Sequence, residues 1–213
     1  MKLLNKFNKI KESILNVLLP ISCVGCGREG QYICKSCEVF LSETPPAKEV
    51  SSVWTYEGLT EKLIYKIKYD GCYQIISELV EKAFVKIDLK LFPDTYITYV
   101  PMFKKREKLR GFNQSALLAQ KLGHCLSGAS NSPWPVTSLL EKIKDNRSQV
   151  GLNPKEREEN VKGVFKFCGE AAPKNILLVD DVYTTGATTK ECCRVLKKAG
   201  VKNISIFTLA RTV

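Results

Sequence analysis

Residues 176–189 read ILLVDDVYTTGATT, and this stretch decides the fold. Its first four residues are all apolar, which is typical of a strand that is covered on both faces. Two carboxylates, Asp180 and Asp181, follow at the carboxyl end of this strand, where open α/β sheets bind their ligands. A turn rich in Thr and Gly then leads into a helix that we expect over 186–199, because apolar residues recur there at helical spacing before Gly200.

The turn that follows the two acids has the features of a phosphate site. Hydroxyls and the N–H groups of a helix N-terminus bind anions, and Gly186 lets the backbone approach a ligand closely. Carboxylates beside a phosphate would repel it unless they have another role. Accepting hydrogen bonds from sugar hydroxyls is one such role, and holding Mg²⁺ is another. A ribose that carries phosphate satisfies both requirements.

Strands and helices alternate along the rest of the chain. Hydrophobic periodicity predicts strands at 51–56, 96–100, 136–140, 161–167 and 204–210, and helices at 59–68, 75–87 and 114–126. Such alternation indicates an α/β fold with a largely parallel twisted sheet flanked by helices. The link Thr44-Pro45-Pro46 marks an expected boundary between an N-terminal module, 1–46, and an α/β domain, 47–213.

Four of the nine cysteines stand in two CxxC pairs, Cys23 with Cys26 and Cys34 with Cys37. Four thiolates complete a tetrahedral zinc site and leave no open position for catalysis, so we expect a structural zinc knuckle over 23–42. Disulfides, a redox-active pair and an iron–sulfur cluster are the alternatives. An odd cysteine total with tight CxxC pairs favours a reducing compartment, and the cytoplasm is the expected location.

The first 19 residues carry apolar side chains at helical spacing and predict an amphipathic helix. Lysines and Glu12 crowd its apolar stretch, and no small-residue cleavage site follows, which argues against a signal peptide. We expect this helix to pack on the protein, with docking on a membrane surface or a partner as the alternative. No apolar run approaches the roughly 18 residues that span a bilayer.

A formal net charge of +11 favours anionic partners, although charge also serves solubility. Residues 104–110 concentrate this charge, with five cations and one acid in seven positions directly after an expected strand. This basic loop should lie at the sheet edge that carries the ribose site. There it would neutralise pyrophosphate or nucleic-acid phosphates, with Phe103 and Phe112 placed to stack on bases. A solvated charge run is the alternative.

The segment 176–189 resembles the motif by which type I phosphoribosyltransferases bind 5-phosphoribosyl-1-pyrophosphate (PRPP). The resemblance implies the type I phosphoribosyltransferase fold and Mg²⁺ bound with PRPP. It also implies that Asp180 and Asp181 hold the ribose hydroxyls, and these two are the catalytic residues expected of an active enzyme. The expected PRPP-binding residues are Asp180, Asp181, Val182, Tyr183, Thr184, Thr185, Gly186, Ala187, Thr188 and Thr189, of which the last six take the 5-phosphate.

Other blocks resemble the ComF family of competence-associated, phosphoribosyltransferase-like proteins, which includes the GntX relatives. Residues 110–114 read RGFNQ, and the next block comprises Asn146, Arg147, Gln149, Leu152, Glu156, Arg157, Asn160 and 163–165. With the cysteine knuckle, the resemblance covers nearly the whole chain. It implies a role in DNA uptake during natural transformation, with single-stranded DNA and a competence helicase as partners. The expected contacts to pyrophosphate or nucleic acid are Phe103, Lys104, Lys105, Arg106, Arg110, Arg147 and Arg157.

Three functions follow from these patterns, and the residues leave all three open. The first is a PRPP-binding protein that also binds single-stranded DNA in transformation. The second is a working phosphoribosyltransferase that releases pyrophosphate, with an unidentified acceptor, since no base-recognition segment is evident. The third is a PRPP sensor without DNA binding.

Overall fold

The computed structural model describes residues 21–87, 89, 92–130, 132–146 and 153–213. The chain forms two compact units that divide between Leu41 and Ser42. The smaller unit holds the cysteine knuckle and a short helix, α2 (Lys35–Glu38). The helix predicted over 1–19 and the predicted contact Arg147 lie outside the described residues.

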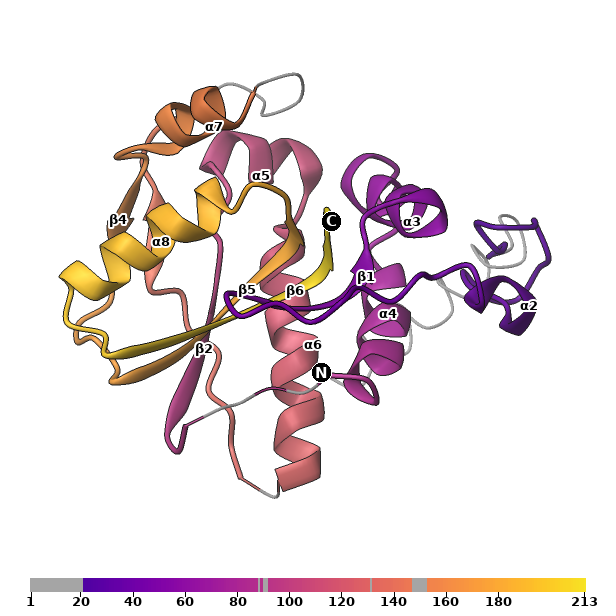
Figure 1. Cartoon of the computed structure of the whole chain (residues 1–213), viewed down its shortest axis with the longest axis horizontal. Coiled ribbons are helices and arrows are strands. Elements are labelled where there is room, and N and C mark those ends of the chain that lie inside the picture. Colours follow the sequence, from indigo (N-terminus) through magenta and orange to yellow (C-terminus); the bar gives the residue numbers. More distant parts are fainter. Residues whose placement is uncertain (1–20, 88, 90–91, 131, 147–152) are drawn as a thin grey trace, which may run out of the picture. The chain divides into compact units, whose positions relative to one another are not determined.

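A four-stranded parallel sheet forms the centre of the larger unit (Figure 1). Its strand order is β1 (Ser51–Thr55), β6 (Asn203–Arg211), β5 (Asn175–Tyr183) and β2 (Thr95–Tyr99). All neighbouring pairs run parallel, so every strand delivers its carboxyl end to the same edge of the sheet. β5 lies between β6 and β2 and is buried from Asn175 through Asp181, as expected of a strand covered on both faces.

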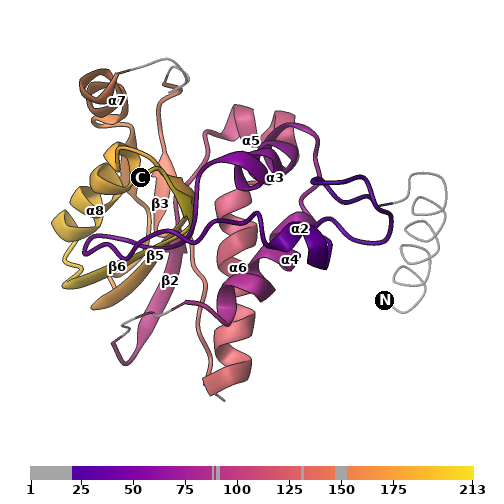
Figure 2. The same ribbon diagram turned by 45° about the vertical axis from the view of Figure 1, so that its right-hand side comes forward.

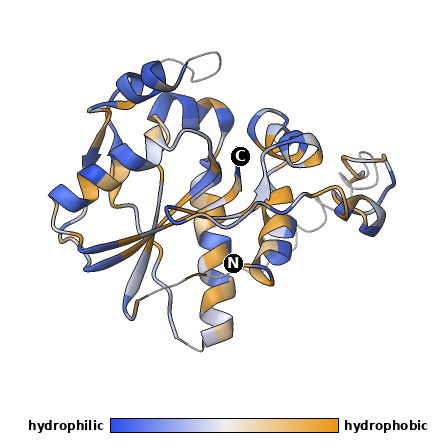
Figure 3. Cartoon of the chain, in the orientation of Figure 1, coloured by the Kyte–Doolittle hydropathy of each residue, from blue (hydrophilic) through white to orange (hydrophobic). Residues whose placement is uncertain are grey.

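Helices cover both faces of this sheet (Figure 2). α6 (Gln114–Ser130) packs against β5 and β2, and α4 (Ile75–Phe84) packs against α6. α8 (Ala187–Lys198) lies across the sheet from α6, and α3 (Gly58–Tyr69) precedes α4 in the chain. Hydrophobic residues colour one side of α4 and α6 and hydrophilic residues the other, which is the amphipathic pattern of helices that cover a sheet (Figure 3).

A two-stranded sheet lies beside α8. Its strands, β3 (Leu140–Lys142) and β4 (Phe165–Phe167), pair antiparallel, and β4 packs against α8. The strand predicted at 136–140 is wrong over most of its length, because Val136 forms only an isolated bridge to Ile97 and regular pairing begins at Leu140.

The strand predicted at 161–167 is also too long, since Val161 ends a helix, α7 (Pro154–Val161). This helix begins with a capping box: Asn153 accepts a hydrogen bond from the backbone N–H of Glu156, whose carboxylate accepts one from the N–H of Asn153. Periodicity does not predict this helix, because the polar segment carries too few apolar residues.

The basic loop predicted at 104–110 is in fact a helix, α5 (Lys104–Arg110). Its seven residues are Lys, Arg, Glu and Leu, which are all strong helix formers, and Gly111 ends the helix with φ 86° in the left-handed region. Because residues four apart share one side of a helix, Arg106 and Arg110 project together.

The larger unit begins at Ser42, whereas the sequence predicted a boundary after Pro46. Residues just before the two prolines add to the edge of the sheet. The backbone N–H of Thr55 donates to the carbonyl of Ser42, and that of Thr44 donates to the carbonyl of Val53. These hydrogen bonds tie 42–44 to β1.

The predicted fold class is confirmed: a parallel sheet flanked by helices, with a small N-terminal four-cysteine cluster. Among the helices of the described ranges, none is both long enough and apolar enough to cross a bilayer.

Candidate functional site

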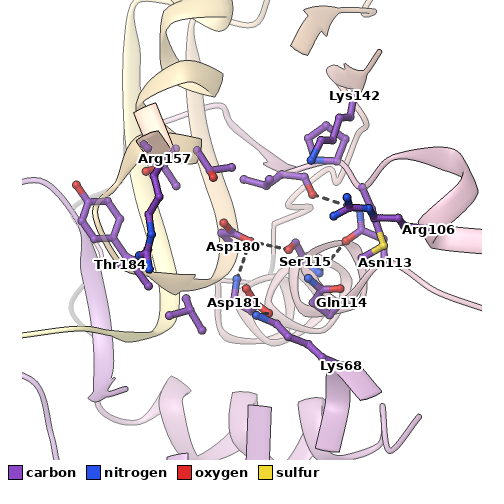
Figure 4. Close-up of a pocket in the computed structure, with 18 of the residues that line it drawn as sticks. Lys68, Arg106, Asn113, Gln114, Ser115, Lys142, Arg157, Asp180, Asp181 and Thr184 are labelled. Carbon is purple, nitrogen blue, oxygen red and sulfur yellow. Dashed lines mark hydrogen bonds and ion pairs between the residues drawn. The ribbon is translucent and has the colours of Figure 1, made fainter. Parts of the chain in front are cut away.

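A cavity of about 500 Å³ opens at the carboxyl edge of the parallel sheet (Figure 4). Segments far apart in the sequence line it: the end of β1, α3, the α5–α6 region, β3, α7 and the turn between β5 and α8. Its charged residues are Glu61, Lys68, Arg106, Arg110, Lys142, Arg157, Asp180 and Asp181. Among the described residues that line the cavity, five cations therefore face three carboxylates, a balance that favours an anionic ligand.

The two acids predicted at the tip of β5 lie side by side in this cavity, and each is largely buried. Oδ1 of Asp180 accepts hydrogen bonds from the hydroxyl of Ser115 at 2.8 Å and from the backbone N–H of Asp181 at 2.9 Å. Burial, followed by the negative charge of Asp181, raises the pKa of Asp180 from its ordinary 3.8 to about 7.

Lys68 supplies the counter-charge. Its ammonium nitrogen lies 2.7 Å from Oδ2 of Asp181, and Figure 4 shows the side chain reaching from α3 towards the acid pair. Burial lowers the pKa of Lys68, but the charge of Asp181, its hydrogen bond with Lys68 and the charge of Asp180 together outweigh burial, and the net pKa is raised. Sequence reasoning missed Lys68. The available signal was a charged residue within the apolar stripe of α3, four positions after the buried Ile64.

The glycine of the predicted phosphate turn is required by geometry. Gly186 has φ 74°, and a Cβ built there would fall 2.2 Å from the hydroxyl oxygen of Tyr183. The Tyr183 hydroxyl donates in turn to a carboxylate oxygen of Glu49 at 3.2 Å. The hydroxyl of Thr189 donates to the carbonyl of Gly186 at 3.0 Å and closes the first turn of α8. Without a side chain at Gly186, a ligand can approach the backbone of the turn closely at the N-terminus of α8.

Most of the predicted PRPP-binding segment lines the cavity. Its lining residues are Asp180, Asp181, Val182, Tyr183, Thr184, Gly186, Ala187, Thr188 and Thr189. Thr185 is not among them; its hydroxyl accepts a hydrogen bond from the backbone N–H of Ala187 at 3.4 Å and so supports the start of α8.

The predicted basic contacts divide into two groups. Arg106, Arg110 and Arg157 line the cavity. Phe103, Lys104 and Lys105 do not. Lys104 is 83% exposed and pairs with Glu141 at 2.8 Å, away from the acid pair.

Two of the lining arginines are held in place by specific partners. Arg106 pairs with Asp145 at 2.8 Å and donates to the carbonyl of Asn146. Arg110 donates to the side-chain oxygen of Gln114 at 2.7 Å, and its guanidinium lies 5.6 Å from the centre of the Tyr69 ring. These contacts fix the guanidinium groups before any ligand arrives.

Lys142 is a further cavity cation that the sequence did not reveal. It comes from β3 and lies 5.7 Å from the centre of the Phe165 ring. Burial, together with the like charge of Arg106, lowers its pKa. An anion that binds between Lys142 and Arg106 would offset the electrostatic repulsion between these two cations.

The smaller unit brings together the four cysteines predicted as metal ligands. The Sγ atoms of Cys23, Cys26, Cys34 and Cys37 all lie within 4.8 Å of one another. The Sγ atoms of Cys26 and Cys34 are 3.6 Å apart, far beyond the roughly 2.05 Å of a disulfide. Four sulfurs at Zn–S distances of about 2.3 Å would stand about 3.8 Å apart, so the set fits tetrahedral zinc.

Backbone N–H groups support a thiolate in this cluster. The N–H of Cys34 donates to Sγ of Cys23 at 3.4 Å. Burial raises the pKa of Cys23, but hydrogen bonds from the N–H groups of Cys34, Cys26 and Gly25 more than offset it and lower the pKa to about 6. The donor chemistry is therefore suited to a metal such as zinc.

Comparison with known proteins gives a consistent set of relatives. The chain is 30% identical to "Competence protein F" of Haemophilus influenzae, over 89% of this chain and 84% of that protein. It is 31% identical to "Competence protein ComFC" of Bacillus subtilis, over 89% of this chain and 78% of that protein. It is 28% identical to "DNA utilization protein YhgH" of Salmonella typhimurium, over 90% of this chain and 84% of that protein.

No protein-family model matches the chain. Among solved structures, a hypoxanthine phosphoribosyltransferase from Staphylococcus aureus aligns with 65% of this chain and 64% of its own, at a TM-score of 0.35 and 11% identity.

Proposed function

Because the chain belongs to the ComF family of competence proteins, we propose that it binds PRPP with Mg²⁺ in the cavity and handles single-stranded DNA during natural transformation. One observation carries the PRPP assignment: a buried acid pair and a glycine turn at a helix N-terminus line one cationic cavity. Asp180 and Asp181 would accept hydrogen bonds from the ribose hydroxyls, and the turn 184–189 would take the 5-phosphate.

The arrangement of the cavity suits the shape of PRPP, which carries phosphate groups at two ends of a ribose. In Figure 4, Thr184 lies on one side of Asp180, and Arg106 and Lys142 lie on the other. The ribose would sit over the acids, with the 5-phosphate towards Thr184 and the pyrophosphate towards the two cations. Charge-assisted hydrogen bonds from these cations would hold the pyrophosphate.

The residues present fit Mg²⁺ that enters with the ligand. Mg²⁺ prefers oxygen ligands and is held in such sites by one or two carboxylates, waters and substrate phosphates. The carboxylates of Asp180 and Asp181 line the cavity beside the proposed pyrophosphate position. When bound, the ion would neutralise phosphate charge.

We also propose that the four-cysteine cluster holds a structural zinc ion. Its folding unit is small, and zinc binding supplies roughly 10–16 kcal/mol in finger peptides, enough to order such a loop. The odd cysteine total with its tight CxxC pairs supports a location in the cytoplasm. The family resemblance supports a competence helicase as partner.

Calorimetry tests the PRPP assignment. Wild-type protein with Mg²⁺ should bind PRPP, and Asp180→Asn with Asp181→Asn should weaken binding at least about a hundredfold, since two charged acceptors worth about 1.5–3 kcal/mol each are removed. Asp70→Asn, at an exposed acid that caps the carboxyl end of α3 and does not line the cavity, is the matched control. Undiminished affinity in the double variant would refute the assignment.

The DNA role predicts a steep fall of single-strand affinity with salt, because phosphate contacts release counterions. A filter-binding series at rising salt, with and without PRPP, measures this fall. An affinity for single-stranded DNA that does not change with salt would contradict phosphate binding. A protein that binds PRPP but binds no single-stranded DNA at low salt would instead support the PRPP sensor without DNA binding.

A working phosphoribosyltransferase is the second candidate, and the raised pKa of Asp180 favours it. A carboxyl with a pKa near 7 is present in both its protonated and its ionised form at neutral pH, which suits a general acid or base. Incubation with PRPP, Mg²⁺ and a panel of nucleobases would release pyrophosphate with sustained turnover if the protein is a transferase. PRPP bound without turnover would exclude this activity for the bases in the panel.

A further inference from the structure

Four aromatic side chains lie on α3 or close to it, and one of them, Tyr69, lines the cavity. Tyr65 and Tyr69 belong to α3, Tyr73 follows it, and Phe112 lies between α5 and α6. The three tyrosines are 56%, 60% and 47% exposed. We call these four residues the aromatic strip. Aromatic rings normally bury most of their area, so three exposed rings within nine positions are not explained by core packing.

The rings of the strip are held in defined pairs. The centres of the Tyr65 and Tyr69 rings are 4.7 Å apart, and those of Tyr73 and Phe112 are 5.7 Å apart in an edge-on arrangement. The guanidinium of Arg110 packs on Tyr69 and belongs to α5, so the strip spans the two elements. Rings fixed in this way present faces to solvent at little cost in side-chain entropy.

Exposed lysines occur on both α3 and α5. Lys62 lies on the same side of α3 as Tyr65 and Tyr69, because the three are spaced three and four residues apart. On α5, Lys105 and Lys108 are exposed. Exposed rings among cations are the two components of a surface that stacks bases and tracks a phosphate backbone.

We propose that the aromatic strip stacks unpaired bases of single-stranded DNA, and that the strand runs along it to the mouth of the cavity. This inference rests on the proposed function, to which it adds the location of the DNA. Several exposed rings can serve several bases, which favours a strand over a free nucleobase. Stacking is tolerant of sequence, because every base has a π-face.

The strip and the cavity share Tyr69, and the guanidinium of Arg110, which also lines the cavity, packs on its ring. A ligand that fixes this pair changes the surface that the strand meets. PRPP and single-stranded DNA should therefore alter each other's affinity by the same factor, as linkage requires.

The test uses the full chain and fluorescence anisotropy with two labelled probes of roughly twelve nucleotides, one of thymidine and one with abasic sugars. The two probes carry the same phosphates, so only the first reports stacking. Tyr65→Leu combined with Tyr73→Leu removes two rings that do not line the cavity. Tyr96→Leu is the matched control, because Tyr96 is 39% exposed near the opposite edge of the sheet.

The double variant should bind the thymidine probe at least about tenfold more weakly. Its affinities for the abasic probe and for PRPP should equal those of the wild type, and Tyr65→Trp with Tyr73→Trp should restore thymidine-probe binding. Unchanged affinity for the thymidine probe, or an equal loss on both probes, would overturn the inference. So would thymidine monophosphate that competes as strongly as the strand, because the occupant would then be a free nucleotide.

The outcomes separate this inference from the function on which it rests. A wild-type protein that binds neither probe at low salt would refute the proposed DNA role. If the wild type and the double variant bind the thymidine probe equally well, the proposed DNA role stands and only the assignment of the strip as its binding site is refuted.

Discussion

The ammonium nitrogen of Lys68 lies 2.7 Å from Oδ2 of Asp181, so that a cation from α3 neutralises one of the two carboxylates at the tip of β5. The Lys68 side chain is 21% exposed and that of Asp181 11%, which sets this ion pair apart from those on the surface. It joins two segments more than a hundred residues apart and explains how two adjacent acids persist in a partly buried site.

Lys68→Met should lower the free energy of unfolding by about 2–4 kcal/mol, because it leaves a buried carboxylate without its counter-charge. Urea denaturation measures the change. Lys66→Met is the matched control on the same helix: Lys66 and Asp70 are paired at 3.2 Å but are 42% and 43% exposed, and such pairs contribute less than ~1 kcal/mol. Equal losses in the two variants would contradict the structural role given to Lys68.

The raised pKa of Asp180 predicts a specific pH dependence. A carboxyl with a folded-state pKa of about 7 and an ordinary value of 3.8 binds its proton more tightly in the folded state. Its contribution to stability is therefore present at low pH and is lost as the pH rises from about 4 to about 7, by up to ~1.4 kcal/mol per pH unit.

Asp180→Asn removes this titration. The unfolding free energy of the variant relative to the wild type should increase between pH 5 and pH 8 in urea denaturation, because only the wild type pays to ionise a buried acid. Taking the difference cancels the titrating groups that lie far from Asp180. A difference that stays constant over this interval would show that Asp180 ionises freely.

Gly186→Ala should weaken PRPP binding and lower the unfolding free energy by about 2–4 kcal/mol, because strain at positive φ adds to a steric clash. The added Cβ would fall 2.2 Å from the hydroxyl oxygen of Tyr183. Gly71→Ala separates the two costs. Gly71 has φ 70° and nothing within 4 Å of its virtual Cβ, so that variant should lose only about 1 kcal/mol.

Zinc content tests the cysteine cluster. Purified protein should carry about one equivalent of zinc, and Cys34→Ser should abolish stoichiometric binding, because Cys34 is buried within the four-sulfur set. Cys72→Ser, at a cysteine outside the cluster, should retain the metal. Less than half an equivalent in the wild-type protein would count against a zinc site.

The local part of the candidate site could be predicted from sequence because it is contiguous. The apolar run, Asp180, Asp181 and Gly186 follow one another, and a strand, a turn and a helix N-terminus place them together without reference to the rest of the fold. The same holds for the cysteine cluster, whose four ligands lie within 15 residues.

The rest of the cavity depends on strand order, which periodicity does not reveal. Lys68 comes from the segment after β1, and Ser115 comes from the segment after β2. Both residues reach the tip of β5 because β5 and β6 lie between β1 and β2 in the sheet. The charge-rich segment at 104–110 shows a second limit. Its composition indicated a basic surface, but only the helix determines that Arg106 and Arg110 enter the cavity while Lys104 pairs with Glu141.

The most direct measurement is a crystal structure of the protein with Mg²⁺ and PRPP. We expect the ribose hydroxyls within hydrogen-bond distance of the carboxylates of Asp180 and Asp181, the 5-phosphate on the backbone N–H groups of the turn 184–189, and the pyrophosphate beside Arg106 and Lys142. PRPP bound elsewhere, or a cavity without PRPP at saturating concentration, would contradict the central claim.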